Sequence, residues 1–302
     1  MTPDVNTGLE AVAASQTLKT FLGPVAERVF GPLADDVGKE LQQWYQGRRE
    51  RFRKVVDRAD RLLPPAAESD GRHIPMRVLN AVMNDGTLSD DEVAVNYFGG
   101  LLASSRTGID RDDRGAMLSA VVGRLSTYEI RTHYLIYAHA HVHMRGSNFN
   151  FGMSTERETH ARILLPISVW AEGMEFTKEE MESPGVGDVL SDSVLGLIRE
   201  ELIDDAFGFG SEDALIGMGF GGLQMGQGLS VQLSPLGVRL FVWAHGRNHS
   251  VLQYFLDPEA DFAAPDMPAL LPGALTLEEA RQRRLELAAS AKQHAADSVG
   301  ES

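Results

Sequence analysis

The sequence predicts a mainly α-helical protein, in which a helical N-terminal domain is followed by a winged-helix-like C-terminal module with a small β-hairpin. Two observations support this prediction. Apolar residues recur at helical spacing over most of the first half of the chain, and the later sequence changes to helix, alternating strand and returning helix. We expect a helical domain over residues 1–150, a winged-helix-like module with a glycine-rich insertion over 151–260, and a peripheral tail with a C-terminal helix over 261–302.

The N-terminal region predicts helices that are separated by short turns. A long helix is expected from near Pro32 to Pro64-Pro65, because two consecutive prolines end a helix. Its second half is a basic patch that includes Arg48, Arg49 and Arg51. We expect this patch to contact the acidic second domain of the same chain, with binding to nucleic acid or acidic lipid as the alternative.

One continuous helix is predicted from about residue 114 to residue 144, with an apolar stripe at three- and four-residue spacing. On this helix Arg124, Tyr128 and Arg131 would share a face. We expect the two arginines to pair with the Asp112-Asp113 run, in a polar network that also includes His133.

The second half of the chain predicts a different set of elements. A short amphipathic helix at 191–203 precedes a glycine-rich insertion at 206–228, an alternating strand at 229–233 and an apolar helix at 238–244. These are the parts of a winged helix. Further on, Thr276 and Glu279 form a capping-box signature for the C-terminal helix.

Several motifs stand out in the first domain and recur more weakly in the second. They are Tyr97-Phe-Gly-Gly-Leu-Leu-Ala-Ser-Ser-Arg106, Asp110-Arg-Asp-Asp-Arg-Gly115, Arg124-Leu-Ser-Thr-Tyr128, Ile130-Arg-Thr-His-Tyr-Leu-Ile-Tyr137, Gly196-Leu-Ile198 and Leu233-Ser-Pro-Leu-Gly237. Together they resemble the abortive infection alpha family, bacterial proteins that are associated with phage defence. The resemblance implies a helical N-terminal region, a winged-helix-like end and a role in defence, but no catalytic residues.

Composition and charge narrow the classes of function. The chain has no cysteine, which excludes disulfides, thiolate metal sites and cysteine nucleophiles. The N-terminal residues do not have the pattern of a secretion signal, and no apolar run is long enough to span a membrane, so we expect a cytoplasmic protein. The net charge of −15 disfavours binding to nucleic acid. Between Gly185 and Asp257 three basic residues stand against nine acidic ones, which disfavours DNA binding by the winged helix in particular.

The densest cluster of charge contains Arg106, Asp112, Asp113 and Arg114. One interpretation is an enzymatic site, in which an arginine holds a phosphate and the aspartates position a metal or act as acid and base. The other is structural, with aspartates satisfying free N–H groups at a helix start and pairing with the arginines. We favour the structural interpretation, because no phosphate-binding loop accompanies the cluster.

Two further groups of residues are weaker candidates for sites. His139 and His143 would share a helix face and could provide two metal ligands, but packed or exposed histidines at a helix end are the preferred interpretation. In the glycine-rich insertion, Phe209, Met218 and Phe220 could dock on a protein partner or a membrane surface, but a flexible wing hairpin is the preferred interpretation.

The function predicted from the sequence is a bacterial abortive-infection-like protein that acts in phage defence through protein–protein contacts or self-association, without a cofactor. The alternatives are a winged-helix DNA-binding regulator and an enzyme with an Asp/Arg site within residues 106–131. The sequence contains no nucleophile elbow, zinc-hydrolase motif, dinucleotide fingerprint or phosphate loop, so nothing in it favours the enzyme.

Overall fold

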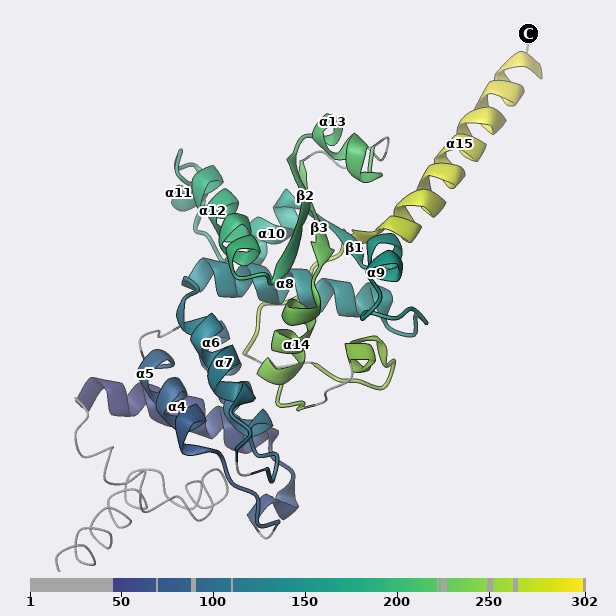
Figure 1. Cartoon of the computed structure of the whole chain (residues 1–302). Coiled ribbons are helices and arrows are strands. Elements are labelled where there is room, and N and C mark those ends of the chain that lie inside the picture. The colour runs from purple at the N-terminus through teal and green to yellow at the C-terminus, as the bar shows by residue number, and fades with distance from the viewer. Residues whose placement is uncertain are drawn as a thin grey trace, which may run out of the picture. The chain divides into compact units, whose positions relative to one another are not determined.

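The structure is a computed structural model that describes residues 46–68, 70–87, 91–109, 111–221, 223, 227–248, 252–262 and 266–300 (Figure 1). The predicted mainly helical fold is confirmed, and the described residues include a four-stranded antiparallel sheet. The chain divides into two compact units. The first lies within Met1–Ile130, Arg239–Ser250 and Phe262–Met267, and the second within Arg131–Val238, Val251–Asp261 and Pro268–Ser302. The expected domain limit at residue 150 falls inside the second unit.

The first unit is organised around the helix α6 (Glu92–Ser104), which is buried from Val93 to Ser104. Asp91 begins this helix, because its carboxylate accepts hydrogen bonds from the backbone N–H groups of Val93 and Ala94. Three helices pack around it: α4 (Gln46–Leu62), α5 (Met76–Asp85) and α7 (Arg114–Gly123). The short 3-10 turn η2 (Pro65–Glu68) lies between α4 and α5 in the chain. The start of the long helix predicted from Pro32 lies outside the described residues.

Two adjacent glycines let α6 approach its neighbours closely. A Cβ at Gly99 would lie 2.6 Å from the side chain of Arg58 on α4, and a Cβ at Gly100 would lie 1.7 Å from the carbonyl oxygen of Ala244. Real Cβ atoms do not approach backbone atoms this closely, so the pair has no room for side chains. Ser104 reinforces the contact by donating a hydrogen bond of 2.8 Å to the carbonyl of Trp243.

We predict that Gly100→Ala destabilises the protein by about 3 kcal/mol or more, because the neighbouring backbone would have to move. Gly187→Ala is the matched control, since its Cβ would meet nothing within 4 Å in the helix that contains it. The control should stabilise the protein by about 0.5–1 kcal/mol. Urea unfolding followed by circular dichroism measures both, and equal effects of the two substitutions would contradict the close contact.

The prediction of one helix from residue 114 to residue 144 is wrong. The chain forms α7 and then α8 (Thr127–Met144), and Ser126 and Glu129 make a capping box that begins the second helix. The Glu129 N–H donates to Ser126 Oγ over 3.2 Å, and the Ser126 N–H donates to the Glu129 carboxylate. The apolar pattern runs on through this break, which is why periodicity alone did not reveal it.

The second unit contains the sheet and the helices that pack on it. The strands are β1 (Arg162–Pro166), β2 (Ile203–Gly210), β3 (Gly228–Leu233) and β4 (Leu275–Thr276), in the spatial order β2-β3-β1-β4. All pairings among the described strands are antiparallel, with Leu164 opposite Ser230 and Phe209 opposite Leu229. The other elements are α9 (Ser154–His160), α10 (Ile167–Gly173), α11 (Lys178–Met181), α12 (Val186–Arg199), α13 (Glu212–Leu215), η3 (Ile216–Met218), η4 (Leu252–Leu256) and α15 (Leu277–Gly300).

Helices α8 and α14 (Pro235–Ala244) have residues in both units. Helix α12 begins and ends earlier than the predicted helix at 191–203, and β1 was not predicted. Among the described helices, none is both long enough and apolar enough to cross a membrane.

Candidate protein-binding surface

Helix α12 presents an acidic stripe on its outer side. Its inner side buries Leu190, Val194 and Leu197, whereas Asp188, Asp192, Leu195 and Arg199 follow each other at intervals of four, three and four residues and are exposed. Leu195 is 53% exposed. Among the described residues, Asp188 and Asp192 take part in no ion pair.

An apolar cavity of about 320 Å³ lies between this stripe and strand β2. It is lined by Ser191, Val194, Leu195, Phe207, Gly208 and Phe209. Within the described sheet β2 is an edge strand, because it pairs only with β3. The ring of Phe209 makes an edge contact with Trp170, at 6.0 Å between centroids. This contact fixes one wall of the cavity.

A second cavity, of about 460 Å³, lies at the C-terminal end of α12. Its lining joins the end of α12, the start of β2 and the start of α14: Ile198, Glu201, Ile203, Asp204, Asp205, Ser234, Pro235 and Leu236. Both cavities therefore border α12 and β2. From Asp188 to Asp205, across α12, the turn and the start of β2, six acidic residues stand against one basic residue, Arg199. We call the exposed parts of α12 and β2, with these two cavities, the α12–β2 surface.

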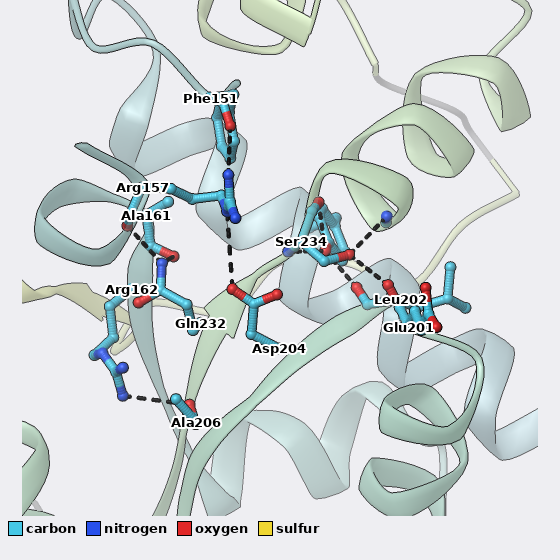
Figure 2. Close-up of polar contacts among 12 residues, drawn as sticks. Phe151, Arg157, Ala161, Arg162, Glu201, Leu202, Asp204, Ala206, Gln232 and Ser234 are labelled. Carbon is cyan, nitrogen blue, oxygen red and sulfur yellow. Dashed lines mark hydrogen bonds and ion pairs between the residues drawn. The ribbon is translucent and has the colours of Figure 1, made fainter. Parts of the chain in front are cut away.

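The turn between α12 and β2 is held in a strained backbone conformation. Glu201 has a φ of 57°, in the left-handed region that favours glycine. The N–H groups of Glu201 and Leu202 donate to the carbonyls of Ile198 and Leu197, which is a Schellman motif with glutamate in the place of glycine. Ser234 Oγ then donates a hydrogen bond of 2.7 Å to the Glu201 carbonyl (Figure 2).

Tyr137 holds the same turn from inside the protein. Its hydroxyl donates to the Leu202 carbonyl over 2.5 Å and accepts from the Ser234 N–H over 3.1 Å. Burial raises the pKa of this hydroxyl well above its usual range, so it stays a hydrogen-bond donor. We call the buried hydrogen bonds among Tyr137, Leu202 and Ser234 the Tyr137 node. This node positions the turn of the α12–β2 surface.

An ion pair lies beside this node, where Arg157 and Asp204 approach to 3.8 Å (Figure 2). Arg157 also donates to the carbonyl of Phe151, and Arg162 donates to the carbonyl of Ala206. Burial raises the pKa of Asp204, although the arginines oppose this shift. The two nearby arginines are therefore engaged with groups of the second unit itself.

The charged cluster predicted from the sequence forms several separate contacts. Arg106 is 4% exposed, and its guanidinium donates to the carbonyls of Ala67 and Arg72 and to the carboxylate of Asp70. It ties the segment after η2 to the end of α6. The structural interpretation expected Arg106 to pair with the aspartates of the cluster, but its partners are Asp70 and two backbone carbonyls.

The two aspartates of the cluster pair with different arginines. Asp112 accepts two hydrogen bonds of 2.7 Å from Arg114, and these bonds lower the pKa of Asp112 to about 2. Arg114 also lies over the ring of Trp243, at 5.2 Å from its centroid. Asp113 pairs with Arg77 over 2.6 Å.

The arginines of the predicted polar network have other partners than the ones expected. Arg131 pairs with Glu175 over 2.7 Å rather than with the Asp112-Asp113 run. Arg124 ends α7, so it does not share a helix with Tyr128 and Arg131. Burial raises the pKa of Asp85, and the charge of Arg124 opposes this shift. His133 is fully buried and stacks on Tyr137 at 4.4 Å. The break at Ser126 is the physical reason for the difference.

The two histidines considered as metal ligands lie on α8, as predicted. His143 contacts the Glu279 carboxylate over 2.8 Å. His139 is 3% exposed, and burial, with a smaller effect of His143, lowers its pKa to about 4. No group of three or more His, Asp or Glu side chains within the described residues forms a metal-binding set.

The glycine-rich insertion forms a small core instead of an exposed apolar surface. Phe220 is 1% exposed and packs with Leu164, Leu215, Leu223 and Ala280, while Met218 packs against the same cluster. Phe209 lies half-buried in β2. The expected docking role of these three residues is thus replaced by packing for Phe220 and Met218, and only Phe209 borders the α12–β2 surface.

The basic patch on α4 is partly used in packing. Arg48, Arg49 and Arg51 are half-buried, and Arg51 donates to the carbonyl of Thr87 over 3.1 Å. Further along α4, Lys54 pairs with Glu92 and Arg61 pairs with Asp266. These partners all belong to the first unit.

The sequence did not single out Asp188, Asp192, Leu195 and Arg199. Their spacing was the signal that could have found them, but the helix was predicted to begin only at residue 191. Comparison with family models, with curated protein sequences and with solved structures finds no match to this chain.

The buried His139 predicts a dependence of stability on pH. Because its pKa is lowered in the fold, the unfolded chain binds the proton more strongly, so stability is full above pH 6.5 and falls between about 6.5 and 4. His139→Leu removes this titration. Urea unfolding at pH 7 and pH 5 should therefore show a smaller loss of stability in the variant, and an unchanged loss would contradict a neutral, buried His139.

Proposed function

We propose that this chain acts in bacterial abortive infection, in defence against phage, through protein–protein contacts made by the α12–β2 surface. The motifs that resemble the abortive infection alpha family support the setting. The observation that supports the mode of action is the exposed stripe of Asp188, Asp192 and Leu195 beside an apolar cavity. Acidic residues around an apolar cavity favour a protein partner that has basic residues around an exposed apolar side chain.

The order of the elements supports a winged-helix-like module in the second unit. Strand β1 is followed by the helices α10 and α12 and by the hairpin β2–β3, and β3 lies between β2 and β1 in the sheet. A winged helix has this order: a strand, two helices, and a hairpin whose second strand pairs with the first strand. In this arrangement α12 has the position of the helix that reads DNA in helix-turn-helix proteins.

The electrostatics of α12 favour protein over DNA as the partner. A helix that enters the major groove needs cations to neutralise phosphates, but the exposed stripe has two aspartates and a single arginine, Arg199. Arg199 itself lies 3.2 Å from the carboxylate of Glu200. The DNA-binding alternative therefore receives no support from this helix.

The enzymatic alternative also lacks support. Asp112, Asp113 and Arg131 belong to three different ion pairs, with Arg114, Arg77 and Glu175. Arg106 has its guanidinium occupied by two carbonyls and a carboxylate. A phosphate held by these arginines would have to displace the existing contacts.

We predict that Asp188→Lys/Asp192→Lys abolishes protection against phage while leaving the fold intact, because both side chains are exposed. The measurement is the efficiency of plating of a phage panel on cells that express each protein at matched levels. Plaque counts on the variant should rise at least about tenfold over those on the wild type, because the reversed charges would repel a basic partner.

The matched control is Glu50→Lys/Glu158→Lys, which changes the net charge equally at exposed positions on α4 and α9. It should protect as the wild type does. Equal protection by all three proteins would refute a role for the α12–β2 surface. Failure of the wild type to protect against any phage would refute the defence setting, and salt-dependent binding of duplex DNA by the purified wild type would favour the regulator.

A further inference from the structure

Most of the described part of helix α15 projects from the second unit without packing on it. Its first turn is anchored: Ala280 is buried, and Thr276 and Glu279 form the predicted capping box. From Arg281 to Lys292, by contrast, every side chain is exposed except that of Arg284, which is half-buried. Leu285 is 67% exposed. In proteins most of the stability of a helix comes from packing of one face, and the segment from Arg281 to Lys292 has almost no such packing within the described residues.

The exposed part of α15 has a basic and apolar stripe. Arg281, Arg284, Leu285, Ala288 and Lys292 fall within a sector of about 100°, given 100° per residue. Between Arg281 and Lys292 the one acidic residue is Glu286, and it lies outside this sector. We call these five residues the α15 stripe.

The α15 stripe matches the α12–β2 surface of the same protein in charge, polarity and length. Cations around a leucine face aspartates around an apolar cavity. The α15 stripe extends from Arg281 to Lys292, and the stripe on α12 extends from Asp188 to Arg199. Both pairs of end residues are eleven positions apart, so each stripe is about 16 Å long.

The α15 stripe is not placed to reach the α12–β2 surface of its own copy. Helix α15 follows β4, at one edge of the sheet, whereas α12 packs beside β2, at the other edge. In Figure 1, α15 points away from the sheet and from α12. Docking within one copy would require the anchored first turn of α15 to leave its core.

We propose that the α15 stripe of one copy docks on the α12–β2 surface of a second copy. This inference rests on the proposed function, because it names the occupant of the same surface. The two contact regions are different faces of the protein, so the interface is heterologous, and repeated docking produces open chains or rings. Each copy offers one helix and one surface.

The test compares two charge-reversal variants of the full-length protein by light scattering coupled to size-exclusion chromatography. Asp188→Lys/Asp192→Lys disables the surface, and Arg281→Glu/Arg284→Glu disables the helix. The wild type should form oligomers whose mass rises with concentration. Each variant alone should dissociate, with a Kd raised by more than about tenfold, because like charges would meet across the contact.

Two further samples separate a direct contact from loss of folding. An equimolar mixture of the two variants should associate, because each supplies the part that the other lacks. The chain with all four substitutions should also associate, since opposite charges face each other again. Leu285→Asp should weaken association, whereas Leu287→Asp, on another face of the helix, should not. Thermal melts monitor the fold of every variant.

A wild type that is monomeric at its highest soluble concentration would overturn the inference. So would a mixture, or a variant with all four substitutions, that stays monomeric. Phage plating distinguishes this failure from failure of the proposed function. If the surface variant loses protection and the helix variant keeps it, the surface acts on a different partner. The self-association inference then fails, whereas the proposed function stands. Loss of protection in both variants, with recovery in the variant that has all four substitutions, supports self-association.

Discussion

The buried hydroxyl of Tyr137 is the interaction on which the candidate surface depends. It joins the end of α12, through the Leu202 carbonyl, to the end of β3, through the Ser234 N–H. A side chain at Gly237 would collide with it, because a Cβ there would lie 2.0 Å from the hydroxyl oxygen. These hydrogen bonds hold the strained turn at Glu201 in place, so removal of the hydroxyl would take a partner from the buried Leu202 carbonyl and from the Ser234 N–H.

The motifs that resemble the defence family have mostly structural roles in the first unit. Tyr97 is buried, Gly99 and Gly100 give close contacts, and Arg106 ties the segment after η2 to α6. The residues that make these motifs distinctive therefore determine how the helices of the first unit pack. The proposed α12–β2 surface overlaps only the two weaker motifs of the second unit, because Ile198, Ser234, Pro235 and Leu236 line one of its cavities.

The sequence predicted what depends on neighbours along the chain and missed what depends on distant ones. The mainly helical fold and the start of α15 at Thr276 and Glu279 followed from periodicity and capping, which act over a few residues. The pairing of Arg131 with Glu175 and the packing of Phe220 against Ala280 join segments about 40 and 60 residues apart, and nothing local encodes them. The break at Ser126 was missed because the apolar stripe continues across it.

If the α12–β2 surface contacts protein during infection, a partner will lie within reach of position 195. Site-specific photo-crosslinking from position 195 in phage-infected cells measures this contact, with position 153, where Met153 is similarly exposed, as the reference. We expect a protein adduct from position 195 that is absent from position 153 and is lost when Asp188→Lys/Asp192→Lys is added. Equal adducts from both positions, or an adduct with nucleic acid from position 195, would contradict it.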